Sequence, residues 1–322
     1  RHLEQTFPNE VTTVSYENIT EKNIASALEE AIHAGCNIIF TTTPTFAQES
    51  LRAAITHPEV RILNCSLNTT HRYIRTYYTR MHEAKFLMGA IAGEMAENDK
   101  IVYIADYPIL GTIAQINAFA LGAQMTNPRA KVYLEWSTLK EQDIEKRIDE
   151  IDPNCISGKD IIVPDDNNHF YGVYHRESGG GEQKNLAMPL CHWGKFYEEL
   201  IRTIMAGNWE QDNDVEKAIN YWWGMPTGVV DVICSKKLPA GTVRLVNVLK
   251  HNYKTGQFHT FTDQMYAQGH ILKEKKGETL SPEEVIEMDW LAENIIGRIP
   301  KIEELQEQAK PVLTQQGIET RK

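Results

Sequence analysis

Residues 61–96 hold the pattern from which we infer the rest of the fold, and they read RILNCSLNTTHRYIRTYYTRMHEAKFLMGAIAGEMA. This pattern predicts, in order, a strand, a polar turn, a second strand and a helix, at 61–66, 67–72, 73–79 and 82–95. Gly89 and Gly93 lie four residues apart on the helix, so we expect another element to approach its backbone closely. The polar turn follows a strand end, where open α/β sheets bind ligands. We therefore expect this segment to join two lobes and to line the cleft between them.

Strands and helices alternate along the chain before this segment. The predicted elements are strands at 11–16, 37–43 and 61–66 and helices at 20–35 and 49–54. The later two strands are continuous apolar runs with short polar loops after them. That pattern is typical of a parallel sheet covered by helices on both faces.

The same alternation begins again at Lys100. The predicted strands are 101–105, 131–136, 160–163 and 229–235, and the predicted helices are 112–124, 141–151, 194–205, 243–253 and 282–296. The Gly-rich span 176–184 predicts a surface hairpin or loop, and the charged span 210–217 a loop or lid.

Together these units predict an α/β fold with two parallel-sheet lobes joined by crossover strands. We assign residues 1–98 and about 191–240 to the first lobe, and residues 99–190 and about 241–322 to the second. Capture of a ligand by hinge closure is the activity that this shape most often supports.

The composition excludes several classes of function. The chain has 322 residues, of which 42% are hydrophobic and 24% charged, which is typical of globular proteins. No apolar run reaches the roughly 18 residues of a transmembrane helix. The net charge of −11 argues against a nucleic-acid partner.

The five cysteines are scattered, without metal-ligand spacing, and an odd number cannot all pair within the chain. Cys36 and Cys65 border apolar runs, so we interpret them as buried thiols. This favours a reducing compartment or a cell surface that tolerates free thiols.

The first residues, RHLEQTFPNE, contain no initiator methionine, signal peptide or lipidation cysteine. Residues 1–7 look like the end of a helix that has no beginning. We therefore expect the chain to be a fragment that lacks at least one strand upstream.

Common catalytic motifs are missing from the sequence. There is no nucleotide-binding glycine loop and no serine-hydrolase elbow, and Phe86 occupies the second histidine position after His82-Glu83 that a zinc helix would need. We expect no catalytic residues, no metal and no cofactor. Asp165 and Asp166 are predicted at a strand end, where they fit a metal, a ribose hydroxyl pair or a solvated turn equally well.

The candidate ligand-binding residues lie at predicted strand ends. Thr42, Thr43 and Phe46 suit a polar heteroaromatic ligand, with a capped turn and a core phenylalanine as the alternative. Asn68 has the corresponding place after the next strand, and Asp106 begins the loop after the strand at 101–105.

Three further candidates flank predicted junctions. Arg80 and Glu83 either pair with each other across a turn or face the ligand. Trp193, after Cys191-His192, either stacks on a heterocyclic base or packs in the structure.

Five stretches together resemble a known family. They are NIIFTTTPTF (37–46), RILNCSLN (61–68), RTYYTRMHEAKFLMGAIAG (75–93), KIVYIADYPILGTIAQINAFALGAQ (100–124) and PLCHWGKFYEELI (189–201). With the E-x-x-F-L-x-G-x-x-A-G core at 83–93, they look like the basic membrane protein family, substrate-binding proteins of ABC transporters similar to the purine nucleoside receptor. The resemblance runs from about residue 11 to residue 208 and more loosely to residue 299.

The resemblance implies a type I periplasmic-binding-protein fold with three crossings between lobes and no catalysis. It also implies a nucleoside-like ligand, permease subunits as partners, a monomer, and an extracytoplasmic location with a lipid anchor upstream of this fragment. Tyr174 replaces the ribose-binding aspartate of the family's G-V-D motif, and we include it among the ligand-binding candidates.

Two other functions stay open from the sequence. The chain fits a cytoplasmic ligand-sensing domain fused to an upstream regulatory domain, because it has unpaired cysteines and no export signal. A less favoured alternative is a cleft enzyme that uses Asp165, Asp166 and His192.

Overall fold

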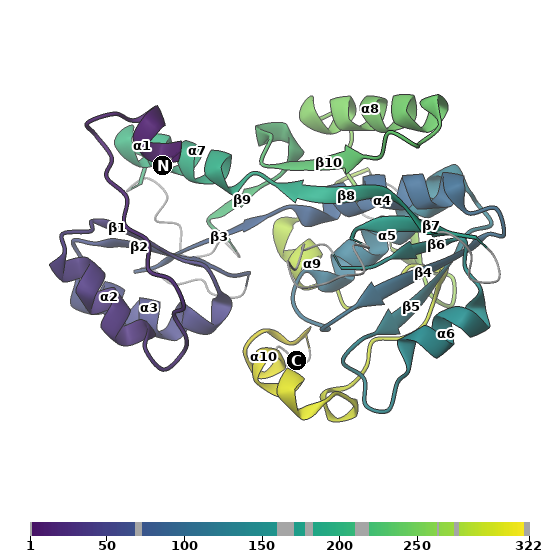
Figure 1. Ribbon diagram of the computed structural model, residues 1–322, viewed down its shortest axis with the longest axis horizontal. Coiled ribbons are helices and arrows are strands. Elements are labelled where there is room, and N and C mark those ends of the chain that lie inside the picture. The colour runs from purple at the N-terminus through teal and green to yellow at the C-terminus, as the bar shows by residue number, and fades with distance from the viewer. Residues whose placement is uncertain are drawn as a thin grey trace. The chain divides into compact units, whose positions relative to one another are not determined.

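The computed structural model describes residues 2–67, 73–159, 171–177, 183–209, 219–262, 264–273 and 277–318 (Figure 1). The chain forms two compact units, each built from two stretches of sequence. Unit 1 comprises Arg1–Thr79 and His192–Trp223, and unit 2 comprises Arg80–Cys191 and Gly224–Lys322. The chain therefore passes between the units three times. We call Thr79–Arg80, Cys191–His192 and Trp223–Gly224 the first, second and third connections.

Unit 1 is a parallel sheet with helices on both faces, as the apolar strand pattern predicts. Its strand order is β1-β2-β3-β9, with the strands at Ile38–Thr41, Arg61–Cys65, Arg75–Thr79 and Tyr221–Trp223. Its helices are α1 (His2–Thr6), α2 (Ile24–His33), α3 (Ala47–Thr56) and α7 (Trp193–Met205), with the short η1 at Pro44–Phe46. Figure 1 shows α2 and α3 on one face of this sheet and α1 and α7 on the other.

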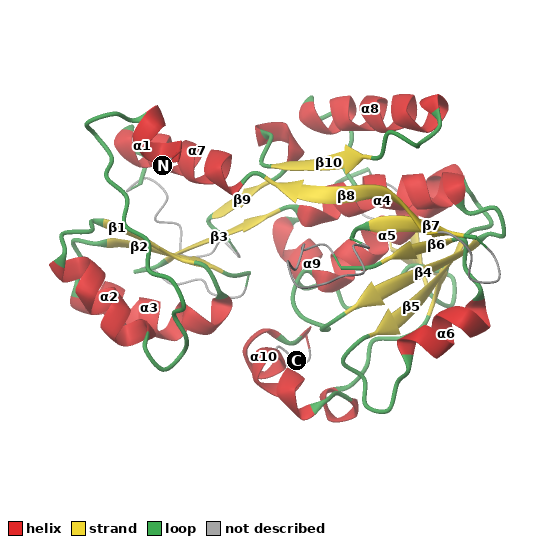
Figure 2. Ribbon diagram, viewed as in Figure 1, coloured by secondary structure: helices red, strands yellow, loops and turns green. Residues whose placement is uncertain are grey.

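Unit 2 contains a sheet of seven strands in the order β10-β8-β7-β6-β4-β5-β13 (Figure 2). The strands are β4 (Lys100–Ala105), β5 (Lys131–Trp136), β6 (Cys155–Ser157), β7 (Val173–Arg176), β8 (Gln183–Cys191), β10 (Val230–Cys234) and β13 (Ile295–Ile296). The α-helices are α4 (Met81–Met95), α5 (Thr112–Thr126), α6 (Ile144–Ile151), α8 (Ala240–Lys254), α9 (Pro282–Ile286) and α10 (Lys310–Gln316). Short elements complete the unit: η3 (Met225–Thr227), η4 (Ile302–Glu304), η5 (Glu307–Ala309) and the hairpin of β11 (Met265–Ala267) and β12 (Ile271–Lys273).

The second sheet is mixed, which corrects the expectation of an all-parallel lobe. Strands β6, β4, β5 and β13 are parallel, whereas β7, β8 and β10 join by antiparallel pairing. The chain reverses after β6, where the backbone N–H of Gly158 donates to the carbonyl of Gly172. Antiparallel neighbours need no crossover helix between them. The predicted hairpin at 176–184 is confirmed in part, because β7 and β8 pair from Arg176 and Gln183 onward; residues 178–182 lie outside the described part of the chain.

Among the predicted elements that the structure describes, two are wrong, one for lack of a pairing partner and one because of a tertiary contact. The strand predicted at 160–163 and the loop or lid predicted at 210–217 lie outside the described residues. Residues 11–16 form no strand, because none of the described strands lies beside them to complete their backbone hydrogen bonds. The helix predicted for 282–296 ends at Ile286. Beyond it, the buried side chain of Asn117 donates to the carbonyl of Trp290 (2.7 Å) and accepts from the N–H of Ala292 (2.9 Å). These bonds replace helical ones and lead the chain into β13.

The packing of α4 decides where the boundary between the two units lies in the sequence. The sequence places residues 80–98 in the first lobe, but α4 lies in unit 2, where it packs along α5 and against β8, α8 and β10. Residues 224–240 belong to unit 2 for a related reason, since β10 pairs with β8. All five cysteines lie in the described residues and none of them forms a disulfide bond; Cys65 is buried and Cys36 half-buried.

The close approach that Gly89 and Gly93 predict is made by α5. A Cβ atom added to Gly89 would lie 1.9 Å from the carbonyl oxygen of Phe119, and one added to Gly122 would lie 2.0 Å from that of Phe86. A Cβ at Gly93 would lie 2.4 Å from the carbonyl oxygen of Ala123. The two backbones are therefore in direct contact, and glycine is required on both helices.

We expect Gly89→Ala to lower the free energy of unfolding by about 3 kcal/mol or more, because the two helices must move apart. Gly241→Ala is the matched control, since a Cβ there meets nothing within 4 Å. In the first turn of α8 it should raise stability by up to about 1 kcal/mol through helix propensity. Urea unfolding of both variants measures the difference, and equal effects would contradict the role of the α4–α5 contact.

Candidate functional site

The carboxyl end of β1 and β2 in unit 1 carries a buried polar network. Thr41, the last residue of β1, accepts a hydrogen bond from the side-chain amide of Asn64 on β2 (2.8 Å) and shares another with Ser50 of α3 (3.0 Å). The Asn64 amide also donates to the carbonyl of Thr43 (2.9 Å). This network fixes where the chain leaves β1, because Thr42 and Thr43 come directly after it.

Thr42 and Thr43 are accessible to solvent to different extents, whereas Phe46 is buried. Thr42 is exposed and Thr43 half-buried, with the Thr43 hydroxyl 3.3 Å from that of Thr45. Phe46 lies in the hydrophobic core with Ile24 and Leu28, so its ring packs in the unit. The two threonines therefore lie at the strand end, whereas Phe46 has the core position that was the alternative interpretation of the sequence.

Two polar atoms near this edge are buried and have no hydrogen-bond partner among the described residues. They are the Oδ1 atom of Asn64 and the hydroxyl of Ser66, which follows β2. Both residues are at most 1% exposed. Buried polar groups are normally paired, and exceptions call for an explanation such as a ligand or water. Neither residue was among the candidates predicted from the sequence, although an amide at position 64 inside the apolar run RILNC is a visible signal for Asn64.

An aromatic cluster lies beside this network in unit 1. The Tyr77 hydroxyl donates to the carbonyl of Thr41 (3.3 Å) and lies 3.2 Å from that of Tyr197. Trp193, the first residue of α7, is half-buried and stacks with Tyr197 at 6.1 Å between ring centroids and 28° between planes. Tyr77 also contacts Trp193 edge-on, so it connects the tryptophan to the strand end. Burial raises the pKa of both Tyr77 and Tyr197, which keeps the two phenols neutral.

In unit 2, Asp106 lies at the carboxyl end of β4. Its side chain accepts a hydrogen bond from the hydroxyl of Ser137, and its carbonyl accepts one from that of Thr138, both just after β5. Asp106 is exposed and therefore accessible at this edge. It is the candidate that unit 2 presents most openly among the described residues.

The C-terminal segment covers much of the same edge. The N–H of Lys140 donates to Glu304, that of Gln306 to Thr138, and that of Leu110 to Gln316. Its side chains form a core cluster with the loops after β4 and β5, comprising Leu305, Ala309, Leu313, Tyr107, Ile109, Leu139 and Ile302. Parallel strand ends that would otherwise be open are therefore closed by residues for which the sequence predicted no helix or strand.

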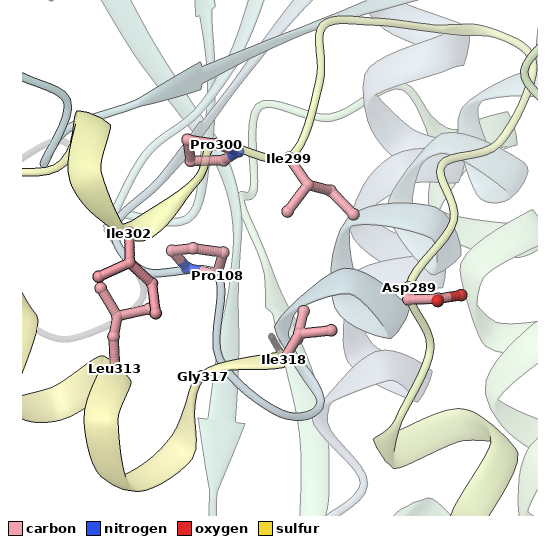
Figure 3. Close-up of a pocket in the computed structure, with 8 residues that line it drawn as sticks. All are labelled: Pro108, Asp289, Ile299, Pro300, Ile302, Leu313, Gly317 and Ile318. Carbon is pink, nitrogen blue, oxygen red and sulfur yellow. The ribbon is translucent and has the colours of Figure 1, made fainter. Parts of the chain in front are cut away.

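A cavity of about 110 Å³ lies between this segment and the loop after β4 (Figure 3). It is lined by Pro108, Asp289, Ile299, Pro300, Ile302, Leu313, Gly317 and Ile318. Figure 3 shows the carboxylate of Asp289 pointing away from the apolar residues. Ligand pockets usually measure about 300–1,000 Å³, so this cavity alone is too small for a nucleoside.

Arg80 and Glu83 lie at the start of α4, beside the first connection. Their side chains are 3.5 Å apart, so they pair as one of the two interpretations expects. Glu83 is 4% exposed, and burial raises the pKa of its carboxyl group. Its Oε2 atom accepts a hydrogen bond of 2.6 Å from the backbone N–H of Met225. The carboxylate is thus engaged within unit 2.

The remaining candidates are Tyr174, His192 and three residues outside the described part of the chain. Tyr174 packs in a core cluster with Val102, Ile151 and Ile156, and burial raises the pKa of its hydroxyl to about 12. Asn68 and Asp165, like Asp166, lie outside the described residues. His192 is exposed and precedes α7. Within the part of the chain that the structure describes, no group of three His, Cys, Asp or Glu side chains could hold a metal ion.

None of the described helices combines the length and apolar character that a bilayer-spanning segment requires.

The chain is similar to a known protein family and to individual proteins of other organisms. The profile of the family described as "ABC transporter substrate-binding protein PnrA-like" (Bmp) matches residues 1–180. A purine-binding protein of Brucella abortus is 24% identical over 313 residues, covering 94% of this chain and 87% of that protein. A putative ABC transporter glucose-binding protein of Haloferax volcanii is 27% identical over 225 residues, covering 66% of this chain and 56% of that protein.

Solved structures show the same fold at low sequence identity. A transcriptional activator of the comK gene from Bacillus halodurans matches with a TM-score of 0.54 and 16% identity, over 74% of this chain and 86% of that one. A solute-binding protein of an ABC transporter system from Conexibacter woesei matches with a TM-score of 0.52 and 11% identity, over 80% and 90%. The predicted bilobal periplasmic-binding-protein-like fold is confirmed.

His82, next to Glu83, gives unit 2 a testable pH dependence. Its ring packs against Phe261, and burial, with a contribution from Arg80, lowers its pKa from the ordinary 6.5 to about 3. The unfolded chain therefore takes up a proton near pH 6.5 that the folded chain accepts only near pH 3. The contribution of His82 to the free energy of unfolding is fully present above pH 6.5 and is lost as the pH falls from 6.5 towards 3. At the lower end of this range the loss is on the order of 4 kcal/mol.

We expect His82→Phe to remove this part of the acid sensitivity. Chemical unfolding between pH 7 and pH 4 should show a shallower loss of stability in the variant than in the wild type. A difference that is constant with pH would report packing only and would contradict the assignment. His33→Phe, at an exposed position, serves as the control.

Proposed function

The chain belongs to the family of PnrA-like ABC transporter substrate-binding proteins, and from this membership we propose that it captures a purine nucleoside or a related polar heterocycle. A substrate-binding role in ABC transport follows from the family itself. The specific ligand and its capture by closure of the two units are our proposal. The purine-binding relative from Brucella abortus supports the choice of ligand class.

The observation that carries the proposal is the pairing of an aromatic surface with unsatisfied polar groups in unit 1. Trp193 is half-buried and stacked on Tyr197, so one aromatic system is already assembled at the start of α7. Tyr77 connects it to the end of β1, where Thr42 and Thr43 offer hydroxyls. A flat heterocycle with hydrogen-bonding edges matches this combination of groups.

Asn64 and Ser66 add buried polar atoms at the neighbouring strand end, and the part of the chain that the structure describes gives these atoms no hydrogen-bond partner. A ligand or a bound water there would satisfy them. In unit 2, the exposed carboxylate of Asp106 suits the hydroxyls of a sugar. We accordingly assign the heterocycle to unit 1 and a hydroxyl-bearing group to Asp106.

In this proposal the protein acts outside the cytoplasm, held at the membrane by a lipid attached upstream of residue 1, and delivers its ligand to permease subunits as a monomer. The family's transport role supports the permease as partner. The lack of a catalytic constellation in the sequence supports a ligand that is bound and released unchanged.

A second function is favoured by one observation. A transcriptional activator from Bacillus halodurans has the same fold. Ligand sensing by a domain fused to an upstream regulatory region is therefore our alternative. The gene sequence upstream of residue 1 separates the two, since transport requires an export and lipidation signal and sensing a cytoplasmic domain.

Isothermal titration calorimetry with adenosine, inosine, guanosine, the free purine bases and glucose tests the ligand class. We expect a nucleoside to bind with a dissociation constant in the micromolar range or below, and glucose to bind at least about tenfold more weakly. Binding of glucose alone would overturn the purine assignment, and failure of every purine compound to bind the folded chain would do the same.

Trp193→Ala should weaken binding of the best nucleoside by about 5- to 150-fold, because stacking of a base on an aromatic ring contributes about 1–3 kcal/mol. Trp193→Phe keeps a ring and should retain most of the affinity. Trp290→Ala, at a half-buried tryptophan of unit 2, is the matched control and should bind like the wild type. Equal affinities for Trp193→Ala and the wild type would show that the base lies elsewhere.

A further inference from the structure

The first and third connections leave unit 1 from neighbouring strands. Strands β3 and β9 are parallel and paired to their last residues, with Tyr77 opposite Tyr221 and Thr79 opposite Trp223. Each of these two connections begins at the last residue of its strand, Thr79 of β3 and Trp223 of β9. The second connection differs, because it follows β8, which pairs within unit 2.

Asn220 joins the same two stretches at the other end of this strand pair. Its side-chain oxygen accepts a hydrogen bond from the backbone N–H of Thr76 (2.8 Å), and its own N–H donates to the Thr76 hydroxyl (3.3 Å). Within unit 1, the two strands that lead to these connections are therefore held in fixed register by backbone and side-chain bonds.

A single carboxylate joins the two connections again on the unit 2 side. Glu83 lies three residues after the first connection, and Met225 is the second residue of unit 2 after the third connection. The Glu83 carboxylate accepts a hydrogen bond of 2.6 Å from the backbone N–H of Met225. Gly224 lies directly against the same group, since a Cβ there would be 2.3 Å from the Oε2 atom of Glu83. Any other residue at position 224 would displace the carboxylate.

Burial makes this carboxylate unusual for a helix position. Glu83 is 4% exposed, and a buried carboxylate is unfavourable unless it is paired and hydrogen-bonded. The groups that act on it are the Met225 N–H and the Arg80 guanidinium, which is about one-third exposed. Burial, with a smaller contribution from Glu83, raises the pKa of Tyr253 on α8. Alanine would suit α4 better on helix propensity alone, so the carboxylate requires a role outside the helix.

We propose that Glu83 is a positioning residue that fastens the first connection to the third, so that both bend together as one two-stranded ribbon when the units close on a ligand. This deepens the proposed function, and Glu83 acts without touching the ligand. The ribbon is bonded at Asn220 and along β3–β9 on one side and at Glu83 on the other. Independent twisting of the two connections is thereby suppressed, which narrows the range of open conformations and lowers the entropy lost on closure.

The test uses no ligand, so its failure is distinct from failure of the proposed function. Spin labels carried by non-canonical amino acids replace Ile55 in unit 1 and Val248 in unit 2, both more than half exposed. Double electron–electron resonance then measures the distribution of distances between the units. We expect Glu83→Ala to broaden this distribution by about twofold. Glu83→Gln keeps an acceptor for the Met225 N–H and should match the wild type.

Glu94→Ala, at an exposed position of the same helix, is the matched control and should leave the distribution unchanged. Gly224→Ala is a second variant for the case that Glu83→Ala does not fold. The added methyl group displaces the Glu83 carboxylate without removing it, so this variant should also broaden the distance distribution. A folded Glu83→Ala or Gly224→Ala protein with the wild-type distribution would overturn the proposal, and so would equal broadening in Glu94→Ala.

Discussion

The contact between α4 and α5 is the constraint on which the rest of unit 2 depends. Every residue of α4 from His82 to Gly93 is buried, so the helix is enclosed on all sides. Glycines on both helices let their backbones touch, and this contact fixes the position of α4 over the sheet. Because α4 begins directly after the first connection, the same packing fixes Glu83. The end of the third connection is then located by its bond to that side chain.

The two units contribute different chemistry at the carboxyl ends of their strands. Unit 1 presents threonine hydroxyls and an aromatic group whose phenols are held neutral by burial. Unit 2 presents the carboxylate of Asp106 beside strand ends that the C-terminal segment has largely covered. This asymmetry matches a ligand with a flat heterocyclic part and a hydroxylated part.

The sequence predicted well what depends on local pattern. The strand predicted at 131–136 has the observed bounds, and the spacing of Gly89 and Gly93 predicts a close approach to this helix backbone, which α5 makes. What depends on distant residues was not predictable in this way. The helix expected to reach residue 296 ends early because Asn117, far away in the sequence, binds the backbone after it.

The same distinction explains the candidate site. Trp193 and the strand-end threonines were identified because aromatic and hydroxyl groups at junctions are visible in the sequence. The position of Phe46 in the core could not be deduced, since its neighbours Ile24 and Leu28 belong to another helix. The bond from Met225 to Glu83 spans 142 residues, and no spacing rule connects them. The buried oxygen of Asn64 likewise becomes informative only when its surroundings are known.

A crystal structure of the chain with the nucleoside that binds most tightly tests the central claim most directly. The account predicts density for the base against Trp193, with its polar edge near Thr42 and Thr43 and with Asp106 beside the hydroxyl groups. Density for the nucleoside at any other place, with these side chains free of it, would contradict the account.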